Sequence, residues 1–381
     1  MSSAVLEEQN IGPKKKARFW NQGEYFDYSL LIVVLFLIGF GLVMVYSTSA
    51  YTASLKIGDA AYYLKRQGLF AVIGVIGMLF VSKVDYHFYK KLTGLAYIAA
   101  FILCIIVQFA GREAGGASRW LQIGPVGFQP SEFAKVAIVL LMALATTNQV
   151  WKMNNFWKLV QIMIPSLILT GIIAIENLST AIICGLIIVT VTFVASPKYG
   201  HFVILGIAGG IVVVLYIVLK GYRSERFDAW LNYETHPKGY QTRQALYAIG
   251  SGGIWGKGLG QSIQKLDFIP EAHNDMIFSV ICEELGIVGG IALILMFVVL
   301  VWRLIQIIMN ARDLYGALLV VGVLAHVSAQ VLINLAVVTN VMPNTGIPLP
   351  FISYGGSSML FLLMEIGIVL SVARQVKVRN G

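Results

Sequence analysis

The chain is 381 residues long, 57% hydrophobic and only 12% charged, with a formal net charge of +9. A soluble domain of this length would carry about 25% charged residues. This composition therefore excludes a soluble globular protein, a disordered chain and a nucleic-acid-binding domain. The three cysteines, Cys104, Cys184 and Cys282, lie in apolar runs, which is typical of small buried side chains rather than disulfides or metal ligands. We therefore expect an integral membrane protein.

Ten apolar segments are long enough to be membrane spans, since a helix needs about 20 apolar residues to cross the hydrocarbon core. The first has a long apolar core and no convincing cleavage site, so we interpret it as an uncleaved span. The predicted fold class is an all-α polytopic membrane protein with one ten-helix domain over 28–373. Its spans are expected at 28–50, 67–82, 91–110, 131–147, 158–175, 179–195, 201–219, 275–302, 315–338 and 352–373.

The distribution of basic residues predicts the orientation. With a cytoplasmic N-terminus, the short outer loops hold only Lys56, Lys65, Arg66, Arg112 and Arg119. The inner segments hold many more: Lys14, Lys15, Lys16, Arg18, Lys83, Lys90, Lys91, Lys152, Lys158, Lys198, Arg303, Arg312, Arg374, Lys377 and Arg379. By the positive-inside rule, the basic tail 1–27 and the tail 374–381 are both expected in the cytoplasm.

Three outer segments interrupt the helical pattern. The large extracellular loop 220–274, between the seventh and eighth spans, is basic, but long outer segments translocate largely regardless of charge. Segment 111–130 is rich in glycine, and segment 339–357 contains three prolines and no charge. Non-helical backbone at membrane depth is tolerated only where protein buries it or where it lines a cavity. The three segments are therefore predicted to line one outward-facing cavity.

Ionisable residues within the spans are costly and are functional hypotheses by default. Glu132 and Lys135 share one helix face, as a structural ion pair or as cavity residues. Glu283 and Glu284 lie about 12–13 Å beyond Asp275 on the same predicted helix, which favours a structural, hydrogen-bonded role for both. The other ionisable residues of the spans are expected to be structural or part of the core, among them His326 and Glu365.

The densest polar cluster, Glu271, His273, Asn274 and Asp275, stands where the large loop enters the eighth span. One interpretation, the weakest, is a divalent-cation site. A second is that Asp275 only caps the helix. A third is that Asp275 is a general base that faces the outer cavity. The spacing alone leaves the second and third open.

The glycine-rich run 250–260 resembles a nucleotide-binding loop but does not satisfy its pattern. Ser251 replaces the first glycine of a P-loop, and Gly258 stands where Ser or Thr should follow. We expect instead that this backbone approaches a polar headgroup, with Lys257 and Lys265 nearby as point charges.

Four motifs carry a family resemblance: RWLQIGPVGFQPSEFAK at 119–135, YQTRQALYAIGSGGIWGKGLGQSIQK at 240–265, PEAHNDMIFSVICEELG at 270–286 and PNTGIPLPFISYGGSS at 343–358. Together and in this order they resemble the SEDS family (shape, elongation, division and sporulation), over nearly the whole chain. The motif that ends in Asp275 and the loop 258–265 are similar to the division branch, FtsW, more than to the elongation branch, RodA.

This resemblance implies a peptidoglycan glycosyltransferase that polymerises lipid II during septal synthesis, at the outer face of the bacterial cytoplasmic membrane. The family's essential aspartate falls on Asp275. The resemblance also implies a class B penicillin-binding protein and other divisome proteins as partners, and no nucleic acid. The residues expected to contact the substrate are Arg119, Gln129, Ser131, Glu132, Lys135, Lys257, Gln264, Lys265, Glu271, His273, Asn274 and Ser353.

The chemistry of sugar transfer needs two things from the protein. A base removes a proton from the acceptor hydroxyl, which is the role expected of Asp275. Positive charge stabilises the leaving diphosphate, and the candidate cations are Lys135, Arg119, Lys257 and Lys265. No tightly bound cofactor or protein-held metal is expected, although Mg²⁺ or Mn²⁺ could arrive with the substrate diphosphate.

Two other functions remain open at this stage. A lipid II flippase would also use intramembrane charges and broken segments, but it should carry polar groups through the full membrane depth. In this sequence the reactive groups cluster at the outer mouth. A noncatalytic scaffold for division proteins gives no reason to keep Asp275 beside a polar cavity.

The charge distribution makes a topological prediction. In intact cells, a tag at either terminus should be protected from a membrane-impermeant reagent, whereas a cysteine introduced by Asn232→Cys should be labelled. Labelling of a terminal tag from outside would refute an even number of spans.

Overall fold

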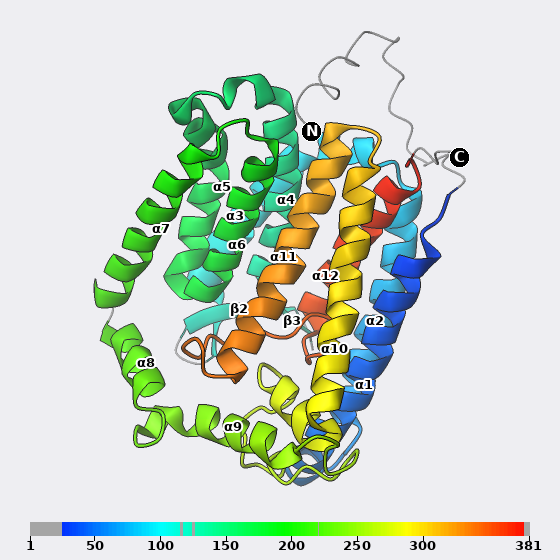
Figure 1. Cartoon of the computed structure of the whole chain (residues 1–381), viewed down its shortest axis with the longest axis vertical. Helices are drawn as coiled ribbons and strands as arrows, with labels where there is room; N and C mark the ends of the chain where they lie inside the picture. The colour runs from blue at the N-terminus through cyan, green and yellow to red at the C-terminus, as the bar shows by residue number, and fades with distance from the viewer. Residues whose placement is uncertain (1–24, 115–116, 124–125, 220, 377–381) are drawn as a thin grey trace.

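The computed structural model describes residues 25–114, 117–123, 126–219 and 221–376. Within these ranges the chain forms a bundle of long apolar helices (Figure 1), which confirms the helical membrane architecture. The long helices are α1 (Tyr28–Ile57), α2 (Tyr62–Lys83), α3 (Tyr89–Ala110), α4 (Pro130–Gln149), α5 (Phe156–Glu176), α6 (Leu178–Ala195), α7 (Gly200–Leu219), α10 (Ile277–Met309), α11 (Leu314–Val338) and α12 (Gly356–Ala373).

In the described ranges, nine helices are long and apolar enough to cross a membrane. Helix α7 lies where the seventh span is expected, but its described apolar part, Gly200–Ile211, is shorter than a span. The count of ten and the orientation stay predictions. Most of the predicted N-terminal tail, 1–24, and residues 377–381 lie outside the described residues.

The outer segments contain regular structure that the hydropathy pattern did not predict. The segment 220–274 holds α8 (Gly221–Leu231), a 3₁₀ turn (Pro237–Gly239) and α9 (Tyr240–Gly252), which extend along the lower end in Figure 1. Segment 111–130 forms a small antiparallel sheet, in which the central strand pairs with both others. Its strands are β1 (Arg112–Ala114), β2 (Ala117–Ile123) and β3 (Val126–Phe128).

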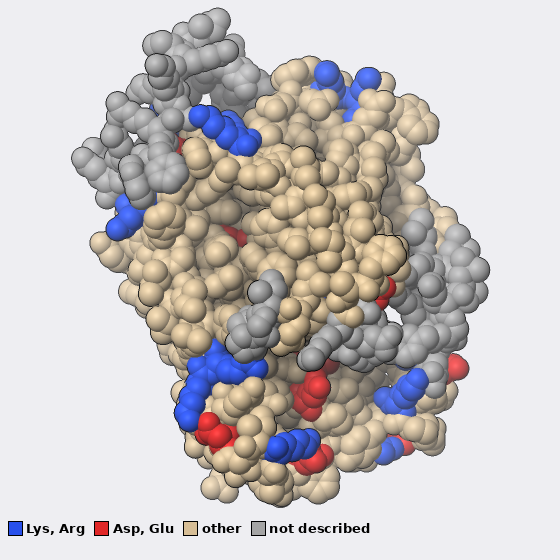
Figure 2. Space-filling model, turned by 180° about the vertical axis from the view of Figure 1, so that it is seen from behind, with Lys and Arg blue, Asp and Glu red and all other residues tan. Residues whose placement is uncertain are grey.

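Helices α11 and α12 form the centre of the bundle. In their apolar stretches 78% and 83% of the residues are buried, against 22% in α2 and in α3. Helix α12 packs on α2, and α11 packs on α4, α6 and α10. On the face seen in Figure 2, charged side chains gather toward the two ends, and a broad, nearly uncharged band lies between them. Polar residues on α11 and α12 are therefore shielded from lipid by the outer helices.

Two polar contacts between α1 and α10 mark the membrane boundaries. At one end the guanidinium of Arg303 lies 2.7 Å from the carboxylate of Asp27. At the other, the hydroxyl of Ser47 donates to the carboxylate of Glu284 at 2.7 Å. The two contacts are separated by about 20 residues on each helix, or about 30 Å at 1.5 Å per residue, which is the thickness of the hydrocarbon core. The two contacts are therefore as far apart as the two edges of a hydrocarbon core; in the orientation predicted from the sequence, Asp27 and Arg303 are on the inner side and Ser47 and Glu284 on the outer.

Helix α10 is broken at Gly286, whose φ of 69° is left-handed. The amides of Ile287 and Val288 then donate to the carbonyls of Gly253 and Ile254 in the glycine-rich run. Two further bonds join the same segments, from the amides of Lys257 and Gly258 to the carbonyls of Glu283 and Glu284. The glycine-rich run thus approaches the broken backbone of α10, and its expected approach to a polar headgroup stays a prediction.

This contact predicts a cost for a side chain at Gly286. A Cβ there would lie 2.2 Å from the carbonyl oxygen of Ile254, in a conformation that L-residues avoid. We expect Gly286→Ala to destabilise the protein by at least the 1–3 kcal/mol typical of such backbone strain, measured by thermal unfolding in detergent. Gly171→Ala is the control, since a Cβ at that helical position meets nothing within 4 Å. Equal unfolding midpoints for the two variants would contradict the prediction.

Candidate active site

Asp275 lies just before α10, at the outer end of the bundle. The N-cap of α10 is Met276, and no side chain caps the helix, so the interpretation of Asp275 as a cap is wrong. Its side chain is largely buried, at 9% exposure. One carboxylate oxygen accepts a hydrogen bond from the Nε2 of Gln241 at 3.4 Å. Of the two interpretations left open by the spacing, the general base is the one that remains a prediction.

The environment of Asp275 suits a proton acceptor. Burial raises the pKa of its carboxyl group to about 6, and the negative charge of Glu271 adds to the rise. The amides of Asp275 and Met276 and the charge of Arg226 act in the opposite direction. A carboxylate with this pKa is mostly ionised at neutral pH, yet it is basic enough to take a proton.

Three elements hold the Asp275 region in place. The side-chain amide of Asn334, on α11, donates to the backbone carbonyls of Asp275 at 2.7 Å and Ile347 at 2.8 Å. Asn344, in the segment after α11, donates to Gln241 of α9 at 2.8 Å. Sequence reasoning did not single out Gln241, Asn334 or Asn344. The sequence did offer a signal for Asn334, because an asparagine is unusual within the apolar sequence of α11.

A cavity of about 330 Å³ is lined by residues 271–274, directly before Asp275, but Asp275 is not itself among its lining residues. Four of the predicted substrate-contacting residues line it: Lys265, Glu271, His273 and Asn274. The rings of Tyr63 and Tyr354, which also line it, pack against His273 with centroids 4.4 and 5.5 Å away. Burial lowers the pKa of His273 to about 4, so its ring is neutral at pH 7. The cavity wall therefore combines aromatic faces with hydrogen-bonding groups.

Ser353 ties the segment after α11 to this cavity. Its hydroxyl donates to the carbonyl of Asn274 at 2.6 Å and accepts from the amide of Leu349 at 2.8 Å. The next amide, of Tyr354, donates to the carbonyl of His273 at 2.9 Å. In the structure, Ser353 positions Asn274 and holds the two segments together.

Glu132 and Lys135 lie in the core of the bundle as a buried ion pair at 2.9 Å. Among the described residues, no ion pair joins Lys135 to Asp275. The arrangement matches the structural ion pair held open by the sequence, and a contact of Lys135 with the donor diphosphate stays a prediction.

The other predicted residues near the start of α4 lie apart from the cavity beside Asp275. Gln129 precedes α4 and is half-buried, and Ser131 is buried in its first turn. The Nε of Arg119, on β2, donates to the backbone carbonyl of Glu176 at 3.1 Å. Arg119, Ser131 and Glu176 line a separate void of only about 20 Å³.

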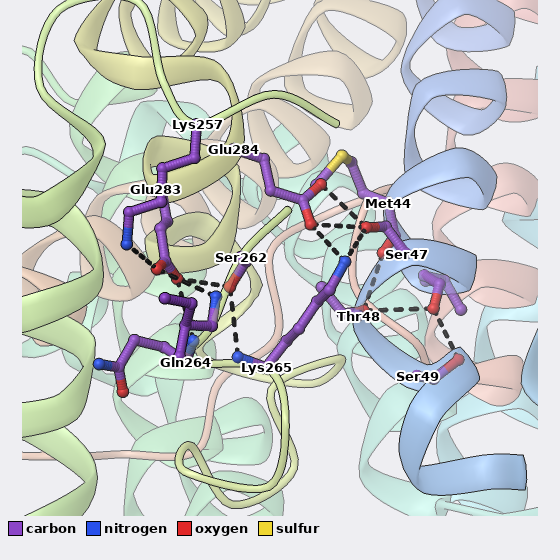
Figure 3. A network of polar contacts seen from close by, with 12 residues as sticks. Met44, Ser47, Thr48, Ser49, Lys257, Ser262, Gln264, Lys265, Glu283 and Glu284 are labelled. Atoms are coloured by element: carbon purple, nitrogen blue, oxygen red, sulfur yellow. Dashed lines mark hydrogen bonds and ion pairs between the residues drawn. The ribbon is translucent and has the colours of Figure 1, made fainter. Parts of the chain in front are cut away.

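The two lysines proposed for the diphosphate are paired with carboxylates of α10 (Figure 3). Lys257 lies 2.6 Å from Glu283, and Lys265 lies 2.7 Å from Glu284. The amide of Gln264 donates to Glu283 at 3.3 Å. These contacts confirm the structural, hydrogen-bonded role predicted for the two glutamates. Lys265 also reaches the cavity wall, whereas Lys257 is not part of it.

A second pair of ionisable side chains lies in the bundle core. The Nδ1 of His326 lies 2.6 Å from the carboxylate of Glu365, and both side chains are buried, as expected for core residues. In the described part of the chain, no three His, Cys, Asp or Glu side chains are arranged to hold a metal. Glu271, His273 and Asp275 therefore do not form the cation site considered for their motif.

The comparisons with known proteins decide the family. A family model of cell cycle proteins, covering FtsW, RodA and SpoVE, matches residues 28–378. The chain belongs to this family. Stage V sporulation protein E of Bacillus subtilis is 39% identical over 91% of this chain and 97% of its own. A protein of Trichlorobacter lovleyi, named "probable peptidoglycan glycosyltransferase FtsW", is 36% identical over 92% of this chain and 94% of its own.

Solved structures have the same fold. A chain of a peptidoglycan synthase complex, described as coordinating polymerization and crosslinking, superposes with a TM-score of 0.78 at 26% identity over 92% of this chain and 98% of that chain. The rod shape determining protein RodA of Thermus thermophilus superposes with a TM-score of 0.69 at 25% identity over 93% and 98%. The SEDS resemblance is thereby confirmed, and the chain is a multi-pass membrane protein.

The buried pair Glu132–Lys135 generates a prediction about its role. Lys135→Met alone leaves Glu132 unpaired in the core, which typically costs 3–5 kcal/mol. The double variant Glu132→Gln, Lys135→Met removes both charges and should recover the thermal stability in detergent. On the prediction that Lys135 supplies positive charge to the reaction, the double variant's polymerisation of lipid II should stay largely lost. Recovery of activity together with stability would assign Lys135 a purely structural role.

Proposed function

We propose that this protein is a peptidoglycan glycosyltransferase that polymerises lipid II at the outer face of the bacterial cytoplasmic membrane, with Asp275 as general base. The enzyme class is supported by the names of its FtsW relatives and by the fold it shares with the synthase complex. The same names support a role in septal synthesis. The observation that carries the assignment of the base is the buried carboxylate of Asp275, whose pKa is about 6 and which directly follows the cavity-lining residues 271–274.

In the proposed reaction, the 4-hydroxyl oxygen of the acceptor sugar attacks the anomeric carbon of the donor. The bond from that carbon to the lipid diphosphate breaks, and the hydroxyl proton passes to Asp275. Asn334 holds the backbone of Asp275, and Gln241 contacts its carboxylate. Because these contacts fix the position of Asp275 before substrate binds, little reorganisation is needed at the moment of proton transfer.

The cavity beside Asp275 suits the polar part of a lipid-linked sugar. Its floor includes Thr48 and Lys265, next to the contact of Ser47 with Glu284 that marks the outer membrane boundary. The cavity therefore lies at the level of lipid headgroups. Its aromatic wall offers faces to sugar rings, and Lys56 and Lys265 offer positive charge to phosphate oxygens.

Stabilisation of the leaving diphosphate is proposed to depend on Lys56 and Lys265 of the cavity wall and, where present, on a divalent cation. Mg²⁺ or Mn²⁺ would arrive on the substrate and be held by its phosphate oxygens. The carboxylates of the described residues do not converge into a three-ligand metal site. The protein's own part in this proposal is the charge at the cavity wall.

We also propose a class B penicillin-binding protein as the partner that crosslinks the glycan strands, with other divisome proteins in the same assembly. The likeness to a chain of a peptidoglycan synthase complex supports such a partner. We place its docking surface on the lipid faces of α10 and α11, the predicted spans eight and nine, and on the large outer segment. In α10 the exposed residues include Ile291, Leu295 and Val298, and in α11 Leu332.

The flippase is the weaker alternative. Glu132, Lys135, His326 and Glu365 do place charge in the bundle core, but they pair with one another. The cavity next to Asp275 is lined by residues of the outer end. A translocation path needs polar groups that face a continuous passage through the membrane. Charged groups that pair with one another in the core do not favour such a passage.

The proposed base makes a prediction about activity and pH. Asp275→Asn should lower lipid II polymerisation by about 10²–10⁴-fold, the usual general-base contribution, with thermal stability retained. In the wild type, activity should fall as the pH is lowered through about 6, because protonation of Asp275 removes the base. Asp228→Asn, at an exposed carboxylate of α8, is the control and should leave activity unchanged. Wild-type product from Asp275→Asn would refute the base and strengthen the flippase.

A further inference from the structure

The glycine-rich run and the residues after it expose a row of large apolar side chains at the outer end of the molecule. Trp255 is 80% exposed, Ile254 63%, Leu259 56% and Ile263 52%. Exposed apolar side chains clustered in this way mark a surface that meets lipid or another protein. The hydropathy pattern placed this stretch in the large outer loop 220–274 and does not explain why it exposes these apolar side chains.

Hydrogen bonds place this row at membrane depth. The amide of Val288 donates to the carbonyl of Ile254, so Ile254 and Trp255 lie beside residue 288 of α10. Residue 288 lies 15 residues from Arg303, or about 22 Å above the inner boundary at 1.5 Å per residue. The hydrocarbon core is about 30 Å thick. Trp255 therefore lies near the outer edge of the hydrocarbon region, although the segment belongs to the outer loop.

The row continues a surface of α10 that faces lipid. Ile287, Ile291, Leu295 and Val298 are all exposed and stand three or four residues apart, so they form one stripe along the helix. Trp302 is exposed beside Arg303 at the inner boundary. Trp255 extends the stripe at its outer end. Tryptophans at both ends of an apolar stripe are typical of the two membrane interfaces.

Part of the backbone of this stretch has the hydrogen-bond partners that lipid requires of non-helical segments. In a bilayer, polar backbone groups need partners within the protein. The carbonyls of Gly253 and Ile254 accept bonds from α10. The amides of Lys257 and Gly258 donate to the backbone carbonyls of Glu283 and Glu284. The amides of Ile263 and of the following Gln264 donate to the side-chain carboxylate of Glu283.

The segment also exposes no unpaired charge. Between residues 250 and 263 the one ionisable side chain is that of Lys257. Its ammonium group lies 2.6 Å from the buried Glu283, as Figure 3 shows. An ion pair at this depth avoids the cost of an isolated charge at the hydrocarbon edge.

We propose that segment 254–263 is embedded in the outer leaflet of the membrane, with lipid acyl chains as the occupant of its apolar row. The segment is then an interfacial anchor that fixes the large outer segment to the bilayer. It also covers the two buried ion pairs of Glu283 and Glu284 from the lipid side. This proposal is independent of the catalytic role of Asp275.

Site-directed spin labelling tests the proposal on the full-length protein in phosphatidylcholine–phosphatidylglycerol vesicles. A nitroxide is attached after Trp255→Cys and, in a second variant, after Leu259→Cys. The native cysteines are buried. Power saturation compares collisions with oxygen, which concentrates in lipid, and with a water-soluble nickel chelate. In the protein without a partner, Ile291→Cys, on the stripe of α10, is the lipid control, and Asn232→Cys, in the outer segment, is the water control.

We expect both labels to resemble the Ile291 control, with a several-fold excess of oxygen over nickel collisions relative to the Asn232 control. Nickel accessibility equal to that at Asn232 for both labels would overturn the proposal. The experiment is repeated after copurification with a class B penicillin-binding protein. If both labels become shielded from oxygen and nickel alike, the occupant is the partner protein and the proposal of a lipid contact is wrong.

Discussion

The outer half of the molecule depends on two adjacent carboxylates buried where α10 is broken. Glu283 accepts hydrogen bonds from Lys257, Ser262 and two backbone amides, and Glu284 binds Lys265 and Ser47. A buried carboxylate without such partners is strongly unfavourable. The carboxylates therefore stabilise one path of the chain from 250 to 265 against α1 and α10. That path forms the floor of the cavity on one side and the apolar row of the outer loop on the other.

Asp275 is held by a second set of contacts that comes from distant parts of the chain. Asn334 and Ser353 bond to backbone carbonyls at 275 and 274, and Gln241 reaches the carboxylate itself. These contacts keep the aspartate away from the first turn of α10, where it would be only a cap. They also bury it, and burial is the main cause of its raised pKa. The same packing thus supplies both the position and the basicity that the proposed reaction needs.

The predicted spans agree with the observed helices because a run of about 20 apolar residues has few alternatives in a bilayer. The outer segments were predicted poorly. Helices α8 and α9 are too polar to be found by hydropathy. The strands of segment 111–130 are too short to show the alternation of apolar and polar residues that identifies a strand. For the glycine-rich run, the sequence showed that another group approaches its backbone closely, but it did not show which group. The neighbour turned out to be the kink at Gly286.

By itself, the sequence determined the membrane class, the positions of the long helices and the family, and it singled out the Asp275 motif as the candidate site. Each of these rests on local composition or on contiguous motifs. Only the tertiary structure decided which charges meet. It paired Lys257 with Glu283 and Lys265 with Glu284, and it brought Gln241 and Asn334 to Asp275. The physical reason is that most of these pairs join residues far apart in the chain, so their distances depend on how the helices pack and not on sequence spacing.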